Sequence, residues 1–426
     1  MSTIDLPDLI PLPKAQRLVL DGVGPLPVET VDLADAGGLV LAAPVRSALT
    51  VPTWDNSAMD GFAVRSADVA AATAGTPVVL PVLGEVAAGR APGLEVVPGT
   101  TIRIMTGAMM PPGADAVVPV EDTDAAPGAS EIPASVAIRA AVRRHDNVRF
   151  AGSDVAAGTL LLDRGRACDP AAIALLAATG TAAVEVHRRP RVAVISTGDE
   201  LVPPGLPLGP AQIHDSNSLT LAAQAVEAGA VVRRMGIARD SLPDLVALVR
   251  EAVAWADVVV LSGGVSVGAH DHVKAAFSDV GTMSLWRVAI KPGRPFAFAR
   301  ATSGDRTVRL FGLPGNPVSV VITFELFVRP VLRLLAGHGR AFDRPVRVAR
   351  LAERMRGSSA RETITRVVLE ADPDRPDGLV ARSSGGQDSY MLASLAAANG
   401  LIFIPPDTDL PAGTDVVAWE LRDRDV

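Results

Sequence analysis

Residues 256–274, ADVVVLSGGVSVGAHDHVK, carry the clearest fold signal in the chain. The segment Val258–Leu261 is a continuous apolar run, which is typical of a strand buried on both faces of a parallel sheet. Small residues then form a turn around Gly263, and Asp271 and Lys274 stand near the start of an expected helix. Backbone N–H groups in such a turn, together with a helix N-terminus, attract anions. Because Asp271 would repel an anion unless a cation lies between them, the stretch predicts an anion site that also recruits a cation.

A regular alternation of strands and helices surrounds this stretch. The expected strands are 192–196, 230–235, 257–261, 285–290, 296–299 and 308–311, and the expected long helices are 215–228, 241–255 and 317–335. Strands that alternate with helices are joined by right-handed crossovers and form a mostly parallel sheet. We therefore predict a three-layer α/β domain over residues 187–336.

The segments that flank this domain show a different pattern. Between residues 49 and 148, short apolar runs are separated by Pro and Gly, which predicts a small β-barrel or sandwich. Residues 337–426 repeat this β pattern and predict a second small barrel at the C-terminus.

Helical spacing of apolar residues appears in 9–23, 31–41 and 171–178. We expect these segments to pack together as a discontinuous helical linker domain, made of residues 1–48 and 149–186. The fold class is then α/β multidomain, with the β-rich segment as an insertion.

The composition limits the classes of partner. The chain has 426 residues, of which 48% are hydrophobic and 20% charged, as expected for a globular protein with several cores. A net charge of −7 without a basic block argues against nucleic acid. Cys168 is the single cysteine, so no intrachain disulfide can form. The N-terminus lacks signal-peptide features, and no uncharged apolar run reaches the ~20 residues of a membrane span, so we expect a cytoplasmic protein without a membrane partner.

Five polar turns follow expected strands of the α/β domain, namely 197–200, 239–240, 262–271, 291–295 and 312–317. Ligands of open parallel sheets bind at the carboxyl ends of the strands. The turns would bring together three acids and three bases: Glu200, Asp240, Asp271, Lys274, Lys291 and Arg294. Each residue alone also fits a solvated turn, but five such turns on one edge favour a site. The mixture suits an anionic substrate held through a hard cation such as Mg²⁺.

Two alternative chemistries involve the same stretch. Residues 264–268 match the G-x-S-x-G pattern of serine hydrolases, with Ser266 as the nucleophile. Such an enzyme needs a histidine further along the chain, and His338 is the only histidine after His272. His270 and His272 are two residues apart, so they do not form the i, i+4 pair of a helical zinc site.

Seven segments, in the same order along the chain, resemble the molybdopterin molybdenumtransferase family, whose eukaryotic relative is the E domain of gephyrin. They are 56–63 (NSAMDGFA), 103–108 (RIMTGA), 147–154, 196–201 (STGDEL), 262–274, 290–295 (IKPGRP) and 313–319 (LPGNPVS). A lone molybdopterin-binding domain would match only residues 190–335.

The resemblance implies a reaction in which molybdate is inserted into adenylated molybdopterin, with release of AMP and a requirement for Mg²⁺. It also implies a homodimer in which the β-rich insertion of one subunit faces the α/β edge of its partner. Direct handover of substrate from a molybdopterin adenylyltransferase is a further expectation.

The resemblance also assigns roles to residues by position. The catalytic residues implied are Asp60, Thr106, Asp154, Glu200, Asp240, Asp271 and Lys291. The substrate- and anion-binding residues implied are Gly263, Gly264, Ser266, Lys274, Arg287, Arg294, Pro314, Asn316, Arg366 and Ser389. The metal ligands expected are Asp60, Glu200 and Asp271.

The chain departs from the family pattern at two places. Arg287 stands where many members have lysine, which keeps the charge but replaces a flexible ammonium with a planar fork. Residues 387–390 (QDSY) replace the common glycine–serine–histidine. A non-enzymatic scaffold with the same fold is the remaining alternative, and the intact set of acids and bases argues for the enzyme.

Overall fold

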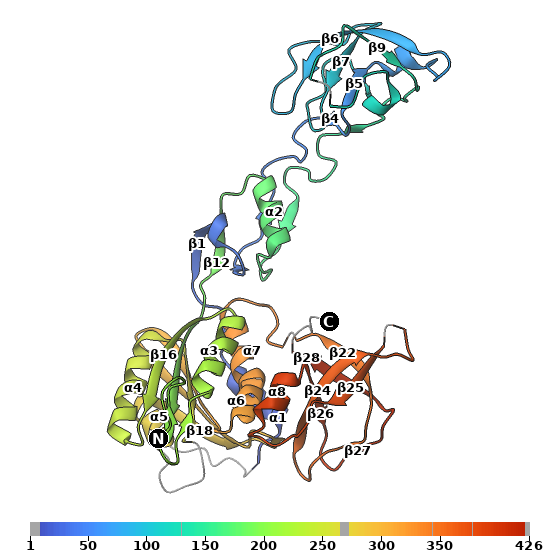
Figure 1. Ribbon diagram of the computed structural model, residues 1–426. Helices are drawn as coiled ribbons and strands as arrows, with labels where there is room; N and C mark the ends of the chain where they lie inside the picture. The colour runs from blue at the N-terminus through green and yellow to red at the C-terminus, as the bar shows by residue number, and fades with distance from the viewer. Residues whose placement is uncertain (1–8, 129, 265–271, 343, 377, 422–426) are drawn as a thin grey trace.

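The computed structural model describes residues 9–128, 130–264, 272–342, 344–376 and 378–421. The chain forms an elongated molecule (Figure 1). The inserted β domain lies at one end, and the α/β domain lies beside the C-terminal barrel at the other. A thin middle segment joins the two ends, and the chain passes through it twice.

The central sheet of the α/β domain has six strands in the order β16-β13-β17-β21-β20-β18. Four are parallel: β13 (Arg191–Thr197), β16 (Val231–Ala238), β17 (Val258–Ser262) and β21 (Arg306–Leu313). Two antiparallel strands complete one edge, β20 (Pro295–Ser303) and β18 (Gly281–Arg287). Every residue of β17 is buried, which confirms the double-faced burial predicted from its apolar run.

Helices cover both faces of this sheet and make the predicted three layers (Figure 1). One face packs against α3 (Asn217–Glu227), α6 (Pro317–Thr323) and α7 (Arg329–Leu335), and the other against α4 (Leu242–Trp255) and α5 (His272–Val280). The single helix expected over 317–335 is interrupted by a π-helical turn, Phe324–Val328.

The linker domain differs from the expected helical bundle. Helix α1 (Leu12–Leu20) buries Leu12, Ala15 and Val19 in the core of the α/β domain and contacts α7, so it does not pack against α2 (Pro170–Ala178). Its apolar stripe is therefore covered by a different partner from the one expected.

The predicted helix over 31–41 is wrong. The segment contains the end of β1 (Val28–Asp32), a 3₁₀ turn at Leu33–Asp35 and β2 (Val40–Leu41). Both strands pair with β12 (Ala183–His187) in a sheet of order β1-β12-β2. Gly38, at φ +71°, interrupts any continuous helix here, and tertiary pairing outweighs the local apolar spacing.

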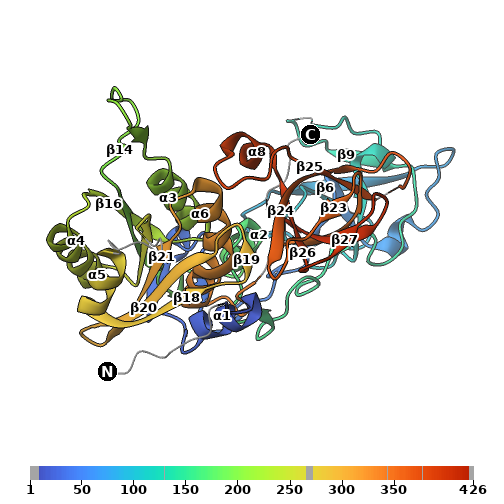
Figure 2. The ribbon, with the colours of Figure 1, turned by 90° about the horizontal axis from the view of Figure 1, so that it is seen from below.

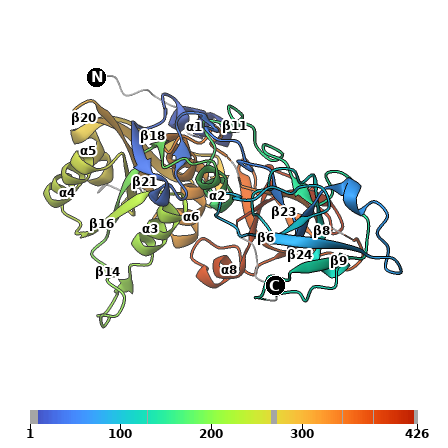
Figure 3. The ribbon, with the colours of Figure 1, turned by 90° about the horizontal axis from the view of Figure 1, so that it is seen from above.

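The inserted domain is a five-stranded sheet of order β8-β5-β7-β6-β9. The strands are β5 (Gly61–Val64), β6 (Val78–Val86), β7 (Thr101–Ile104), β8 (Ala116–Pro119) and β9 (Ser135–Ile138). Alternate residues of β5 enter two apolar cores, Phe62 and Val64 in one and Ala63 in the other. Figure 3 shows β6 and β9 running side by side.

The C-terminal domain is a closed barrel of five strands, because the first and last strands of its ladder, β24 and β26, also pair with each other. The strands are β22 (Val346–Leu351), β24 (Glu362–Ala371), β25 (Leu379–Ser383), β26 (Gly400–Ile404) and β28 (Asp415–Glu420). Strand β19 (Ile290–Lys291) adds to β24 in parallel, and α8 (Leu392–Ala397) contacts α6 (Figure 2). The barrel is thus attached to the α/β domain at two places.

Two 3₁₀ turns, Ser66–Val69 and Val120–Asp122, belong to the inserted domain. Four short strand pairs lie outside the larger sheets: β3 (Val45–Arg46) with β11 (Leu160–Leu162), β4 (Asn56–Ser57) with β10 (Val148–Arg149), β14 (Leu201–Val202) with β15 (Ile213–His214), and β23 (Met355–Arg356) with β27 (Asp409–Leu410). The β14–β15 arm projects from the α/β domain (Figures 2 and 3). Within the described part of the chain, no helix has the length and apolar character needed to cross a bilayer.

Replacement of Asp169 tests how α2 begins. The Asp169 carboxylate accepts a hydrogen bond of 2.8 Å from the Ala172 N–H, whereas Ser241, at the same position before α4, makes no side-chain cap. We expect Asp169→Ala to cost about 1 kcal/mol of stability and to lower the melting temperature. Ser241→Ala is the matched control and should lower the melting temperature less. Equal shifts in calorimetry would contradict the cap.

Candidate functional site

A large groove lies at the carboxyl edge of the parallel strands. Its volume is about 1010 Å³, and its wall is built from the turns after β13, β16, β17 and β21. The predicted residues that line it are Glu200, Asp240, Gly263, Gly264, Pro314 and Asn316. Glu200 and Asp240, the two predicted acids of this edge that the structure describes, therefore lie in one groove, as the topology predicted.

The glycine turn after β17 packs tightly against the end of β13. Gly263 has φ +96°, and a Cβ there would lie 2.6 Å from the Thr197 carbonyl oxygen. A Cβ on Gly264 would lie 2.7 Å from a methyl of Val273. The Gly263 N–H donates to the Leu313 carbonyl at 3.2 Å. It therefore does not point to an anion, contrary to the expectation for this turn. Gly263 instead permits the close approach of three turns.

The next residues of the turn, 265–271, lie outside the described residues. Two predicted site residues, Ser266 and Asp271, belong to this segment, and their roles stay predictions. His338 follows the C-terminus of α7, whereas the helical segment that contains α7 begins at the groove, at Pro317. The histidine that a serine hydrolase would need is thus at the opposite end of this segment.

Asn217 joins the groove's turns to one another. Its Nδ2 donates to Ser262 Oγ and to the Gly315 carbonyl, both at 2.8 Å. Its Oδ1 is buried without a hydrogen-bond partner among the described residues. Sequence reasoning placed Ser262 on this edge within the turn 262–271 but missed Asn217; the signal was a polar residue at a helix start facing the strand-end turns.

Two of the acids that line the groove, Glu200 and Asp240, sit on exposed turns. The Glu200 carboxylate lies over Gly198, where a Cβ would come within 2.5 Å of Glu200 Oε2. Asp240 Oδ1 accepts from the Thr197 hydroxyl at 3.4 Å. A third acid of the groove, Asp215, is 4% exposed, accepts from Ser196 Oγ at 2.9 Å and caps α3 through the Ser218 N–H at 3.0 Å.

The predicted bases are not among the described residues that line this groove. Lys274 is in the first turn of α5, and Arg287 and Arg294 flank the short strand β19. Lys291 lines a different cavity of about 300 Å³, against the C-terminal barrel, with Arg354 and Arg356 among its neighbours. The described wall of the groove therefore contains acids but none of the four predicted bases.

A loop of the C-terminal barrel reaches the groove. Asn316 Nδ2 donates to Ser389 Oγ at 2.9 Å, and the Val318 N–H donates to the Ser389 carbonyl at 3.1 Å. Asn316 precedes α6 without forming a side-chain cap. Tyr390, which is 65% exposed, thereby lines the groove; sequence reasoning missed it.

Arg366 supports this loop from inside the barrel. It is fully buried, and its guanidinium donates to the Gly386 carbonyl at 2.6 Å and to Ser394 Oγ at 3.0 Å. Burial lowers the pKa of this guanidinium. The observed contacts make Arg366 a positioning residue for the loop, and its predicted contact with substrate stays a prediction.

Asp60 and Thr106 come together in the inserted domain. Asp60 Oδ1 accepts from the Thr106 N–H at 2.6 Å and from its hydroxyl at 2.7 Å. These two hydrogen bonds, the backbone one first, lower the pKa of Asp60 below its ordinary value of 3.8. Asp154 is exposed, and its N–H donates to the Val51 carbonyl at 3.1 Å.

These residues are far from the groove of the same chain, because the inserted domain and the α/β domain occupy opposite ends of the molecule (Figure 1). Asp60 and Glu200 therefore cannot ligate one metal ion within one subunit. The described residues contain no group of three or more His, Cys, Asp or Glu side chains placed to hold a metal.

Three family models together match most of the chain. The MoeA N-terminal region (domains I and II) matches residues 10–180, a probable molybdopterin-binding domain matches 193–334, and the MoeA C-terminal region (domain IV) matches 348–421. Molybdopterin molybdenumtransferase 2 of Mycobacterium tuberculosis is 41% identical over 413 residues, which cover 95% of this chain and 98% of the relative. The chain belongs to the molybdopterin molybdenumtransferase family. This confirms the resemblance inferred from the sequence.

Two further comparisons agree with the family and the fold. The molybdopterin molybdenumtransferase of a Nostoc species is 39% identical over 397 residues, which cover 92% of this chain and 88% of the relative. The crystal structure of a molybdopterin biosynthesis MoeA protein from Pyrococcus horikoshii has a TM-score of 0.77 at 33% identity, covering 97% of this chain and all of that chain. The predicted α/β multidomain fold class is also confirmed.

Replacement of Gly263 tests the close approach at the groove. Gly263→Ala places a Cβ against the Thr197 carbonyl and should lower both the melting temperature and substrate affinity, at a cost of about 1–3 kcal/mol. Gly236→Ala is the control, because Gly236 has φ +98° in β16 and nothing within 4 Å of the added Cβ. Equal effects in the two variants would show that backbone strain alone matters at Gly263.

A second test concerns Asp60. The pKa of Asp60 is lowered in the folded protein, so its two hydrogen bonds stabilise the fold fully at pH values above the ordinary pKa of 3.8. This stabilisation is lost as the pH falls through the lower pKa of the folded state. We expect Thr106→Val to raise the Asp60 pKa part of the way, since the backbone N–H bond remains. Carboxyl ¹³C NMR titration measures it, with Thr76→Val as control because Thr76 contacts Thr73. An unchanged Asp60 pKa in Thr106→Val would contradict the assignment.

Proposed function

We propose that this protein inserts molybdate into adenylated molybdopterin and releases AMP in an Mg²⁺-dependent reaction. The observation that carries the proposal is the groove at the carboxyl edge of the sheet, where Glu200 and Asp240 lie beside the Gly263–Gly264 turn. Relatives that align over nearly the full chain are named for molybdenum transfer to molybdopterin, which supports the choice of substrate.

The groove residues have two tasks in this proposal. Asn217 and Ser262 hold the strand-end turns in a fixed arrangement through the Asn217 amide. Tyr390 and Leu392 cover part of the opening from the C-terminal barrel. The loop thus orients the substrate and excludes water from one side of the groove.

The acids fit a magnesium site completed by the substrate. Mg²⁺ prefers one or two carboxylates together with substrate phosphate oxygens, and Glu200 and Asp240 supply two carboxylates without a third described ligand. When bound, the ion would neutralise negative charge on the phosphate and the incoming molybdate. Asp271 remains a candidate for the same site.

We propose that the active form is a homodimer. Asp60, Thr106 and Asp154 match catalytic positions of the family, yet they are at the far end of the molecule from the groove (Figure 1). A second subunit in the reverse orientation would bring its inserted domain to the groove of the first. Sedimentation of a dimer, and restored activity on mixing Asp60→Asn with Glu200→Gln subunits, would support this arrangement.

Several further parts of the proposal follow from the family. Lys291, Arg294, Lys274 and Arg287 would bind molybdate or phosphate oxygens, with Arg287 offering a planar fork instead of an ammonium. Lys291 fits this role from its cavity beside the barrel. The reaction would take place in the cytoplasm, with substrate handed over by an adenylyltransferase.

The decisive experiment mixes the purified protein with adenylated molybdopterin, Mg²⁺ and molybdate and measures AMP. We expect AMP release that depends on Mg²⁺, and a loss of about a hundredfold in Glu200→Gln, because a neutral amide cannot replace the carboxylate. Glu251→Gln, on the exposed surface of α4, is the control. Undiminished turnover of Glu200→Gln with a normal Mg²⁺ requirement would overturn the role of Glu200, and no AMP from the wild type would overturn the function.

A further inference from the structure

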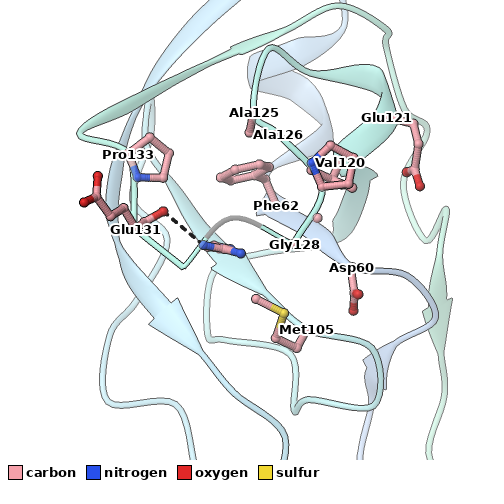
Figure 4. Close-up of a pocket in the computed structure, with 13 residues that line it drawn as sticks. Asp60, Phe62, Met105, Val120, Glu121, Ala125, Ala126, Gly128, Glu131 and Pro133 are labelled. Carbon is pink, nitrogen blue, oxygen red and sulfur yellow. Dashed lines mark hydrogen bonds between the residues drawn. The ribbon is translucent and has the colours of Figure 1, made fainter.

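We propose that a cavity in the inserted β domain binds a flat nitrogen-containing aromatic ring of the substrate. The cavity has a volume of about 210 Å³, and Asp60 lines one side of it (Figure 4). The inference rests on the proposed function for its choice of ligand, and it gives the inserted domain a binding task that its catalytic residues alone do not explain.

The floor and part of the wall of this cavity are apolar, and charged side chains stand around them. Phe62 is 1% exposed and forms the floor, with Met105 and Val120 half-buried beside it. Pro127 and Pro133 complete the wall from the loop that precedes β9. In Figure 4, Phe62 occupies the centre of the view, with Met105 towards Asp60 and Pro133 on the other side. Such a surface favours the face of a ring over a hydrated group.

The charges around the cavity exclude an anionic occupant. Asp60, Glu121 and Glu131 surround it, and the cation of its wall, Arg103, is already engaged. The Arg103 side chain donates to the Glu131 carbonyl at 3.1 Å and forms an ion pair of 3.4 Å with Glu85. The phosphate or molybdate part of the substrate would be repelled here, so the occupant is a neutral part of it.

The chemistry of the edge selects the kind of ring. The Asp60 carboxylate lines this edge of the cavity, and its oxygens accept hydrogen bonds, as they do from the Thr106 N–H and hydroxyl. A ring that carries N–H or amino donors satisfies such an edge, and methionine sulfur makes favourable contacts with aromatic rings. The aminopyrimidine ring of the pterin and the adenine of adenylated molybdopterin share this chemistry, since both are flat and carry an amino group.

The position of Asp60 then sets the direction of the bound molecule. Its Oδ1 is held by Thr106, and its backbone carbonyl accepts from the Val120 N–H at 3.0 Å, so this end of the cavity is fixed. A ring seated between Met105 and Val120 would send its substituent out past Asp60. The charged part of the substrate would therefore lie outside the cavity, facing the groove of the second subunit.

The test fills the cavity without removing a hydrogen bond. Val120→Trp occupies the ring space, and Met105→Ala removes one wall and serves as a second variant if the first does not fold. Calorimetric titration measures binding of pterin (2-amino-4-oxopteridine) and of AMP, and steady-state kinetics measures the KM for adenylated molybdopterin. Val79→Ala is the control, because Val79 is 62% exposed in the same domain and lies outside the cavity.

We expect Val120→Trp to raise the KM about tenfold and to weaken one of the two probes by a similar factor, with kcat little changed. Weaker pterin binding identifies the pterin as the occupant, and weaker AMP binding identifies the adenine. Unchanged KM and unchanged binding of both probes in an otherwise active Val120→Trp variant would overturn the inference. A wild type that binds a probe but releases no AMP would instead overturn the proposed function.

Discussion

The close packing of Gly263 against the Thr197 carbonyl determines the shape of the groove. Only a residue without a Cβ can adopt φ +96° at this distance, and the approach brings the ends of β13 and β17 together. Gly315 lies against the same glycine, since a Cβ on Gly315 would be 3.7 Å from the Gly263 Cα. Asn217 then joins the turns after β17 and β21 through its amide. The acids of the groove are arranged around this fixed set of turns.

The C-terminal barrel depends on the same arrangement. Its loop 386–390 is held from within by Arg366 and from outside by Asn316, which belongs to the turn after β21. A buried guanidinium that binds backbone carbonyls fixes loop geometry at the cost of desolvation, which its lowered pKa reflects. The position of Tyr390 over the groove therefore depends on contacts from two domains.

Much of the α/β domain could be predicted because its signals are local. The apolar run 258–261 indicated a strand buried on both faces, and the turn residues indicated the edge at which Glu200 and Asp240 meet. The helix expected over 31–41 failed because its apolar spacing also suits strands, and pairing with β12 is a contact over more than a hundred residues. No local pattern contains that information.

The site was harder to predict than the fold for the same reason. Sequence order suggested that Lys291 joins the groove, but β19 pairs with the barrel strand β24 and carries Lys291 to another cavity. Asn217 and Tyr390 were missed because their importance comes from hydrogen bonds between segments that are distant in sequence. The family resemblance supplied residue roles that spacing alone did not.

The elongated shape explains why the predicted site residues fall into two groups. The acids Glu200 and Asp240 are on the α/β groove, whereas Asp60 and its donor Thr106 are on the inserted domain at the other end. Carboxylates that meet at one anionic substrate repel one another unless a cation lies between them. Keeping the two groups at opposite ends of the molecule avoids that repulsion in the free subunit. In the proposed homodimer, the cost of bringing them together would be met when the subunits, the substrate and a cation assemble.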